Sequence, residues 1–316
     1  MKHLSLLLVI TSFIIFSCKK DKNTNPGSTG SSDIRLVESI YYSDYEVTKT
    51  EYQYSNNKLI STINYLLFNS DTSWIKTGKS EIKYATNSIE SIAYSYNQYD
   101  STYSPIKKTN YTYQGTLLSE VSEYDFYTST WNLNATNKYQ YLNNKIVSII
   151  VNENNVDVFE NKFVYNSNLL SEVNSYAYDT QSDGMQQVGK SILNYRNNKV
   201  HDLITSYVEN GTWNNDTKVG FDYTVNNQTT LHLQLWSDEI NNWTGNLAQI
   251  DYLYNTMGVL IEEINGAERT IYNYESGSGN AKLFFNAPGY ELLQLPSVKS
   301  QKPMNHAFMQ ELKLTR

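Results

Sequence analysis

The sequence predicts an all-β protein made of about eight antiparallel β-hairpin repeats, each of roughly 28 residues, that form one curved, meandering sheet. Three observations support this fold class. The chain has 28 Tyr, 10 Phe and 5 Trp among 316 residues, and aromatic residues favour strands. A tyrosine motif recurs at a nearly constant spacing. No window before the C-terminus keeps a helical period of apolar residues over three turns.

The overall charge limits the class of partner. The net charge is −7, from 25 Lys and Arg against 32 Asp and Glu. Binding to nucleic acid through counterion release needs clustered positive charge, so we expect no nucleic-acid partner. A single cysteine excludes an internal disulfide and a multi-cysteine zinc site.

Residues 1–17 are predicted to be an export signal rather than part of the fold. Lys2 and His3 precede an apolar run from Leu4 to Phe16. This run is shorter than the roughly 20 apolar residues that a membrane-spanning helix needs, and it has the length of a signal-peptide core. Residues 18–33 are rich in Asn, Ser, Thr, Gly and Pro, which predicts a flexible tether.

The end of the signal, Ile15-Phe16-Ser17-Cys18, resembles the lipobox of bacterial lipoproteins, although Phe16 is bulkier than the small residue usual there. The resemblance implies that Cys18 is lipidated and becomes the mature N-terminus, so that one partner is a membrane. Lys19-Lys20-Asp21 resembles the charged start of many Bacteroidetes lipoproteins. We therefore expect a lipid-anchored cell-envelope protein of the outer membrane, on its periplasmic or its surface face. The alternative is an ordinary signal peptide or uncleaved anchor with a chance cysteine.

From residue 34 onward the chain repeats one unit, marked by an aromatic or aliphatic residue, any residue, and then tyrosine. Most units continue with a turn signal such as Asn56-Asn57-Lys58, because asparagine tolerates the positive φ of a tight hairpin turn. Each unit is predicted to be a strand, an Asn-rich turn, a second strand and a longer loop. The second tyrosines of the marker, here called the repeat tyrosines, are Tyr54, Tyr84, Tyr113, Tyr141, Tyr165, Tyr195, Tyr223, Tyr254 and Tyr274.

The second strand of most units carries two apolar residues three positions apart. Strict alternation would place them on opposite faces, so a β-bulge or a two-faced strand is expected. The pairs are Ile89/Ile92, Leu118/Val121, Ile146/Ile149, Leu170/Val173 and Val200/Leu203. Residues 283–285 and 290–295 are predicted to be closing strands. This gives a repeat domain over residues 34–295 and a C-terminal tail over 296–316.

The segment from Tyr165 to Val173, Tyr-Asn-Ser-Asn-Leu-Leu-Ser-Glu-Val, resembles the YD (RHS) repeat. The resemblance spans about residues 50–275, but the Asp that follows the tyrosine in that family is replaced in every unit. Asn-Lys mostly stands in place of its Gly-Arg pair. The resemblance implies a curved strip of β-hairpins and no catalytic residue.

A transmembrane β-barrel is the alternative fold, since an even number of strands with aromatic girdles is typical of it. The apolar face here is carried by tyrosine, with too few Leu, Val and Phe for an apolar band about 25 Å tall. A lipid anchor would also be redundant for a barrel that spans the membrane. The sequence therefore favours a sheet that lies in water.

Four tryptophans are the candidate ligand-binding residues. They recur about ten residues before a repeat tyrosine, at Trp74, Trp131, Trp213 and Trp243. They could form a row of aromatic platforms for a glycan or an envelope protein. They could instead start each hairpin and pack on its neighbours, which is the interpretation we favour.

Catalytic, cofactor and metal sites are not predicted. His201 and His232 do not have a metal-binding spacing. Paired carboxylates could hydrolyse a glycan, and the candidates are Glu120, Glu172 and Asp202. Because other repeats carry Ser or Thr at the same position, a solvated strand face explains these carboxylates better. We therefore expect a non-catalytic binding or scaffolding module. The alternatives are a glycan-active hydrolase that uses carboxylates of the concave face, and a purely structural surface spacer.

Overall fold

The computed structural model describes residues 34–68, 72–209, 211–224, 228–256 and 259–276. The predicted signal, the Cys18 tether, the closing strands after residue 282 and the C-terminal tail lie outside the described residues. The described part is an antiparallel sheet of 19 strands. The strands are β1 (Ile34–Tyr42), β2 (Glu46–Ser55), β3 (Lys58–Phe68), β4 (Ile75–Tyr84), β5 (Ser88–Asn97), β6 (Thr102–Gln114), β7 (Leu117–Tyr127), β8 (Thr130–Leu142), β9 (Lys145–Glu153), β10 (Val156–Asn166), β11 (Leu169–Asp179), β12 (Gly184–Arg196), β13 (Lys199–Glu209), β14 (Thr212–Tyr223), β15 (Gln228–Ser237), β16 (Asn242–Trp243), β17 (Ala248–Tyr254), β18 (Leu260–Asn265) and β19 (Glu268–Ser276).

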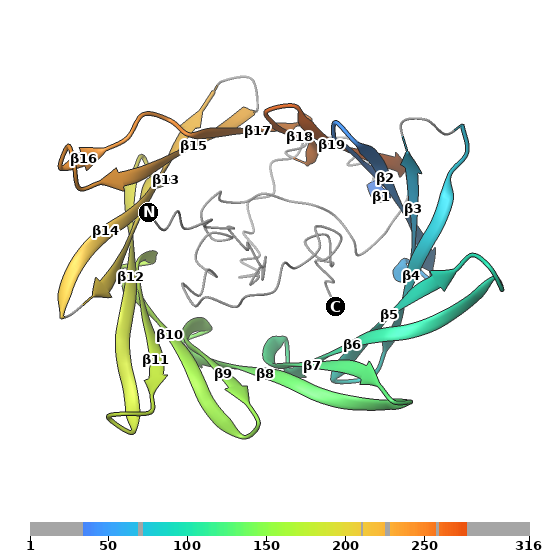
Figure 1. Ribbon diagram of the computed structural model, residues 1–316, viewed down its shortest axis with the longest axis horizontal. Coiled ribbons are helices and arrows are strands. Elements are labelled where there is room, and N and C mark those ends of the chain that lie inside the picture. The colour runs from blue at the N-terminus through green and yellow to red at the C-terminus, as the bar shows by residue number, and fades with distance from the viewer. Residues whose placement is uncertain (1–33, 69–71, 210, 225–227, 257–258, 277–316) are drawn as a thin grey trace, which may run out of the picture.

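The sheet closes on itself. β1 pairs with β2 on one side and with β19 on the other, in a register that runs from Ile34↔Ser276 to Tyr42↔Arg269. The two-residue β16 pairs with the end of β15, and β15 also pairs with β17, which is its neighbour in the wall. The other strands pair with their neighbours in sequence, which makes an 18-stranded β-barrel that Figure 1 shows along its axis.

The predicted all-β chain of antiparallel hairpins is confirmed, but the prediction of one curved, meandering sheet is wrong. A curved sheet would leave two unpaired edges, and closure removes both. The strand that completes the barrel is β1, which has no tyrosine marker before it. Leu36 of β1 pairs with the repeat tyrosine Tyr274, as Leu59 pairs with Tyr54. β19 and β1 are therefore the two strands of a ninth hairpin, split between the ends of the described chain.

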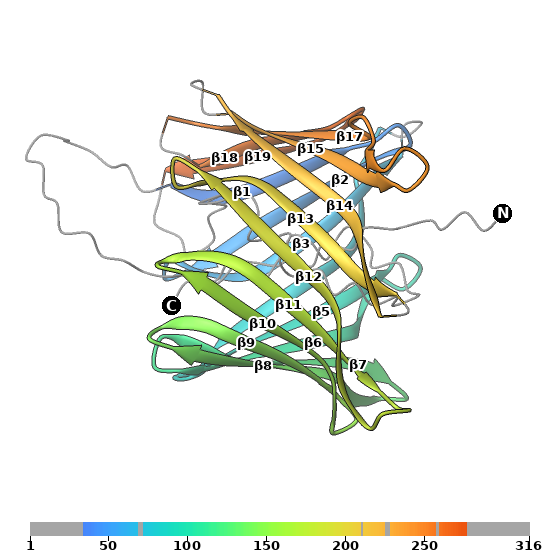
Figure 2. The ribbon, with the colours of Figure 1, turned by 90° about the vertical axis from the view of Figure 1, so that its left-hand side faces the viewer.

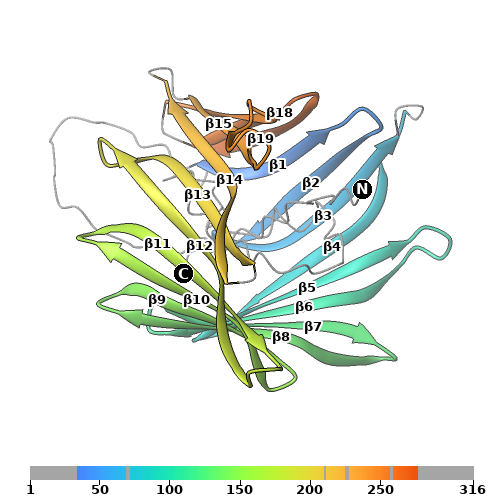
Figure 3. The ribbon, with the colours of Figure 1, turned by 60° about the vertical axis from the view of Figure 1, so that its left-hand side comes forward.

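The Asn-rich turns form as predicted. Asn56 and Asn57 have φ of 49° and 63°, and Asn143, Asn144, Asn197 and Asn198 also have positive φ. This is the backbone conformation of the tight turns that match the twist of paired strands. These turns, together with Ile34 and Ser276, lie at one end of the barrel, which we call the turn rim. The opposite end, where β1 meets β2 and β3 meets β4, is the loop rim. Figures 2 and 3 show the strands crossing the wall obliquely between the two rims.

The predicted bulges are present at four of the five apolar pairs. In β7, Tyr113 pairs with Leu118 and Thr112 pairs with Glu120, so one extra residue lies between the partners. The extra residue puts both members of the Leu118/Val121 pair on the same face. The strands that hold Ile146/Ile149, Leu170/Val173 and Val200/Leu203 have the same shift. The pair Ile89/Ile92 is the exception: β4 and β5 pair without a shift, and Ile89 and Ser91 are the buried residues there.

The core lines the inner face of the barrel wall. Leu59, Val121 and Leu203 are fully buried, with 0% of their surface exposed. Buried residues alternate along the strands with exposed polar ones, as Tyr52 does with Gln53 in β2 and Ile82 with Lys83 in β4. Side chains on the convex outer wall of a barrel cannot be enclosed to this extent, so the Leu, Val and Tyr face is the inner one. Burial raises the pKa of the inner-face tyrosine Tyr52 to about 12.

Candidate functional site

The loop rim carries the exposed aromatic side chains of the described residues. Tyr127, in the hairpin between β7 and β8, is 73% exposed. The turn rim instead exposes the aliphatic Leu142. Exposed aromatic residues supply large, rigid contact area for a partner. The residues of this surface are Tyr42, Tyr45, Phe68, Trp74, Tyr99, Tyr127, Tyr178, Tyr207 and Trp213.

Acidic residues accompany the aromatic ones at the loop rim. The described loops of this rim contain Asp44, Asp100, Asp183, Asp238 and Glu239, and no Lys or Arg. Hydrogen bonds from the side chain and the backbone of Thr102 lower the pKa of Asp100, so that it is ionised at neutral pH. The loop rim is therefore an aromatic and anionic surface.

Two predicted tryptophans use one ring face to pack against a lysine of the outer wall. The Lys49 ammonium lies 4.6 Å from the Tyr65 ring centre and 5.0 Å from that of Trp74. Trp213 lies over Lys190 at 4.5 Å. Trp74 is 37% exposed and Trp213 is 41% exposed, so each keeps part of its ring in water. Trp74 and Trp213 thus pack on a neighbouring lysine and also contribute to the exposed surface of the loop rim.

The other two predicted tryptophans contact further aromatic rings. Trp131 is 4.9 Å from Phe126 and 5.2 Å from the Lys108 ammonium. Trp243 meets Trp236 edge-on at 5.2 Å. Tyr103, at the same repeat position as the tryptophans, lies 4.6 Å from Lys79. The structure therefore gives this position one common role, which is to cover a lysine or an aromatic ring near the loop rim.

A second candidate site is a depression of about 240 Å³ on the outer wall, formed over β13, β14 and β15. Its centre is Gly220, which pairs with Asp202 of β13 on one side and with His232 of β15 on the other. A Cβ atom added to Gly220 would meet no other atom within 4 Å, so the missing side chain leaves open space. Polar side chains surround this space, and they are His201, Asp202, Lys218, Asp222, His232, Gln234 and Asn246. We call this site the Gly220 depression.

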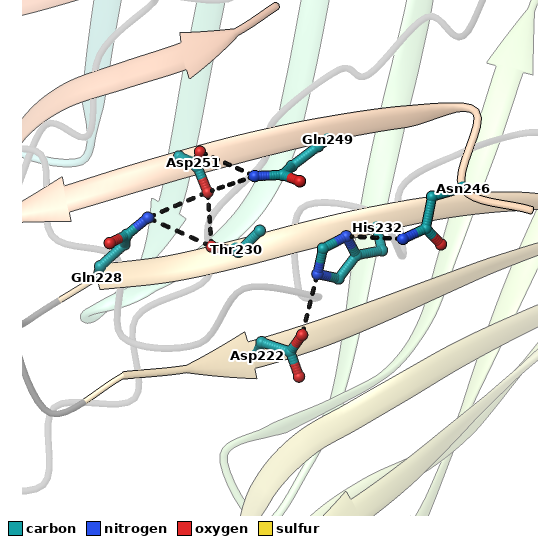
Figure 4. A network of polar contacts seen from close by, with 7 residues as sticks. All are labelled: Asp222, Gln228, Thr230, His232, Asn246, Gln249 and Asp251. Atoms are coloured by element: carbon teal, nitrogen blue, oxygen red, sulfur yellow. Dashed lines mark hydrogen bonds and ion pairs between the residues drawn. The ribbon is translucent and has the colours of Figure 1, made fainter.

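Hydrogen bonds orient both histidines of the Gly220 depression. His201 Nδ1 lies 3.0 Å from Asp202, which also accepts a 2.6 Å hydrogen bond from Asn194. His232 Nε2 lies 2.9 Å from Asp222, and its Nδ1 lies 3.2 Å from the Asn246 amide, as Figure 4 shows. The Asp222 carboxylate and the Asn246 amide therefore hold the imidazole ring of His232 through its two nitrogen atoms.

Asp251 forms a neighbouring network on the same wall (Figure 4). Its carboxylate accepts hydrogen bonds from Thr230 at 2.5 Å and from Gln228 at 3.2 Å. Burial alone would raise the pKa of Asp251, but the hydrogen bonds from Thr230, Gln249 and Gln228, with His232 nearby, lower it. Asp251 therefore stays ionised and saturated with donors, and it is not free to act as a proton donor.

The predicted carboxylates do not form one cleft. Glu120, Glu172 and Asp202 are on three different strands, β7, β11 and β13. Asp202 does share the Gly220 depression with Asp222, but the Asp222 side chain is 72% exposed. The Asp202 side chain is 14% exposed and lies within hydrogen-bond distance of Asn194 and His201. Within the described residues, no group of three or more His, Cys, Asp or Glu could hold a metal ion.

Sequence reasoning missed the Gly220 depression, although a signal was present. The position three residues before the repeat tyrosine carries a side chain in all the units except the one that contains Gly220. These residues are Glu51, Glu81, Asn110, Lys138, Lys162, Ile192, Asp251 and Ile271. Gly220 is the one glycine in this series. A glycine in a strand often marks a place where something approaches the backbone closely.

No family model matches the chain, and no curated protein matches it. Among solved structures, a porin-like protein from Bacteroides uniformis is similar at 11% identity, with 77% of this chain and 96% of that chain covered and a TM-score of 0.44. A protein of unknown function from Bacteroides fragilis is similar at 11% identity, over 46% of this chain and 91% of that chain, with a TM-score of 0.29. The part of the chain that the structure describes contains no helix able to span a membrane.

Proposed function

We propose that the protein is a non-catalytic binding module of the bacterial cell envelope, anchored through a lipid on Cys18, whose loop rim binds an extended neutral glycan. The observation that carries this proposal is that the exposed aromatic side chains gather at one rim of the barrel. Aromatic rings stack on the apolar faces of sugars, and several weak contacts on one surface raise avidity through effective concentration.

The charges of the outer wall support a barrel that lies in water. Lys79 and Glu81, joined by an ion pair, both face outward from β4. A Lys or Arg on a lipid-facing barrel wall costs about 2–4 kcal/mol at the bilayer midplane, and an Asp or Glu costs somewhat less. A row of such residues disfavours an embedded barrel, which leaves the predicted lipid on Cys18 as the means of membrane attachment.

The direction of the chain supports the loop rim as the binding end. Ile34, the first described residue, lies at the turn rim, so a tether that precedes it joins the barrel at that end. The loop rim is the opposite end, about 30 Å away along strands of nine or ten residues. A lipid-anchored barrel would therefore present its aromatic rim away from the membrane surface.

The charge of the loop rim narrows the class of glycan. Its loops carry acidic residues and, within the described residues, no Lys or Arg. An acidic polysaccharide would be repelled, whereas the hydroxyl groups of a neutral one can donate hydrogen bonds to the carboxylates. A basic peptide is the second ligand that this charge favours, and the experiment below includes it.

Affinity electrophoresis of the purified protein in gels that contain neutral polysaccharides tests the proposal. We expect retardation of the wild type, and at least a tenfold weaker effect for the double variant Tyr99→Ala/Tyr127→Ala. The matched control is Leu142→Ala, because Leu142 is 63% exposed at the turn rim. Equal retardation of the folded rim variant and the wild type would overturn the proposal. Binding to a Lys-rich peptide, with no retardation by any polysaccharide, would overturn the proposed glycan ligand and show that the loop rim binds a basic protein segment.

A further inference from the structure

We infer that the Gly220 depression binds a single sugar residue. The inference rests on the proposed glycan-binding function and adds a second, more selective contact to it. At about 240 Å³ the depression is smaller than the roughly 300–1,000 Å³ of sites that enclose drug-sized ligands. One pyranose ring is a ligand of suitable size.

The shape of the site follows from one residue. Asp202 and His232 are the direct cross-strand partners of Gly220, so their side chains stand on both sides of a position that has no side chain. Neighbouring strands are about 4.8 Å apart, which sets these two strands roughly 10 Å apart. A ligand can thus rest on the β14 backbone between two polar walls.

The polar groups of the site match a polyhydroxyl ligand. Asp202 and Asp222 are hydrogen-bond acceptors, whereas Lys218 is a donor and makes no ion pair within the described part of the chain. A sugar hydroxyl can donate to a carboxylate and accept from an ammonium or amide at the same time. A phosphate or carboxylate ligand could not donate to the two aspartates, and their charge would repel it.

The histidines fix the positions of the acceptors. His201 and His232 each hold one aspartate through a hydrogen bond of 2.9–3.0 Å. The Asp222 side chain remains 72% exposed, so its carboxylate is accessible from solvent while its orientation is set. A pre-oriented acceptor loses less conformational entropy when a ligand binds, which favours a weak but selective site.

The position of the site links it to the loop rim. Trp213 and Gly220 are both on the outer wall in β14, and their partners Val208 and Asp202 are six residues apart on β13, which corresponds to about 20 Å along a strand. One glycan chain of several residues can span this distance. The Gly220 depression would then select one sugar of a chain whose other residues contact the aromatic rim.

Titration of the full-length protein with free monosaccharides, followed by ligand-observed NMR, tests this inference. Glucose, galactose, mannose and N-acetylglucosamine are the probes, and we expect at least one to bind with a millimolar dissociation constant. The variant Gly220→Val places a side chain in the depression, where an added Cβ atom would meet no other atom within 4 Å. We expect Gly220→Val to reduce sugar binding at least tenfold at an unchanged melting temperature.

The controls separate this inference from the proposed function. Gly184→Val is the matched control, because an added Cβ atom at Gly184 would meet only the Ser182 backbone oxygen, at 4.0 Å, and Gly184 lies in β12, outside the depression. The rim variant Tyr99→Ala/Tyr127→Ala should keep monosaccharide binding even where it loses polysaccharide binding. Equal sugar binding by Gly220→Val and the wild type, or no binding of any sugar by the wild type, would overturn the inference. In that case, retardation of the protein by a polysaccharide in the gels would still support the proposed function of the loop rim.

Discussion

The hydroxyl of Tyr141 donates a 2.8 Å hydrogen bond to the backbone carbonyl oxygen of Leu118, which belongs to the preceding hairpin. A β-bulge disrupts the strand ladder beside Leu118, so its carbonyl can accept a side-chain donor. Each such contact ties one hairpin to the one before it. The same hydrogen bond, from a tyrosine hydroxyl to a backbone carbonyl oxygen, occurs in five other units. It joins Tyr54 to Leu36, Tyr84 to Leu59, Tyr195 to Leu170, Tyr223 to Val200 and Tyr274 to Leu260.

The Tyr141 contact predicts a graded loss of stability. Tyr141→Phe should cost about 0.5–1.5 kcal/mol, because it removes one hydrogen bond and keeps the ring. Tyr141→Ala should cost about 3 kcal/mol or more, because the ring also leaves the core. The control is Lys138→Ala, an exposed position in the same strand that should change the free energy of unfolding by less than about 0.5 kcal/mol. Equal costs of the three substitutions in urea melts would show that the repeat tyrosines do not hold the hairpins together.

The turn between β7 and β8 predicts a stabilising substitution. Thr128 and Ser129 have φ of 48° and 65°, a conformation that Asn and Gly adopt at lower cost. Thr128→Asn/Ser129→Gly should therefore stabilise the protein by about 1 kcal/mol. Asn144→Gly is the control, because that turn already has Asn at its positive-φ positions and should change little. A lower melting temperature for the double variant would contradict this account of the turn.

Glu263 predicts a pH-dependent change in stability. Burial on the inner face, which outweighs a hydrogen bond from Tyr272, raises the pKa of Glu263 above its ordinary value of 4.5. The folded state then holds this proton more tightly than the unfolded state, so ionisation of Glu263 destabilises the fold as the pH rises. Glu263→Gln should raise the melting temperature at pH 7, and the difference should vanish near pH 4.

The neighbour Glu262 supplies the control for this experiment. Glu262 forms an ion pair with Arg269, so Glu262→Gln should not stabilise the protein at neutral pH. A melting temperature of Glu263→Gln that matches the wild type at every pH would show that Glu263 is hydrated rather than buried.

Local features of the fold could be predicted from the sequence because their causes are local. Asn56-Asn57 specifies a tight turn through its own φ preference, and the spacing of Leu118 and Val121 requires a bulge within one strand. The alternation of Tyr52, Gln53 and Tyr54 likewise sets which face is buried. These inferences depend on a few adjacent residues.

Closure and the Gly220 depression depend on residues far apart in sequence. Tyr274 and Leu36 pair across 238 positions, and Leu36-Val37-Glu38-Ser39 matches the second strand of a repeat without a tyrosine marker before it. The depression needs Asp202, Gly220 and His232 on three strands to share one register. The tryptophan positions were predicted, but the lysine partners of Trp74, Trp131 and Trp213 were missed, because each lysine lies two strands away from its tryptophan.

Pairing of β1 with β19 closes the barrel, and a cross-link between these two strands tests the closure most directly. Ile40 and Ile271 are paired cross-strand neighbours, and directly opposite Cβ atoms lie about 4.5–5.5 Å apart. In a Cys18→Ser background, Ile40→Cys/Ile271→Cys should form an intramolecular disulfide that peptide mass spectrometry detects, because the separation is close to that of disulfide-bonded residues. The control Ile40→Cys/Lys138→Cys places its cysteines on β1 and β8 and should not cross-link within one chain. A folded Ile40→Cys/Ile271→Cys protein that remains fully reduced under oxidising conditions would contradict closure and show that the sheet is open.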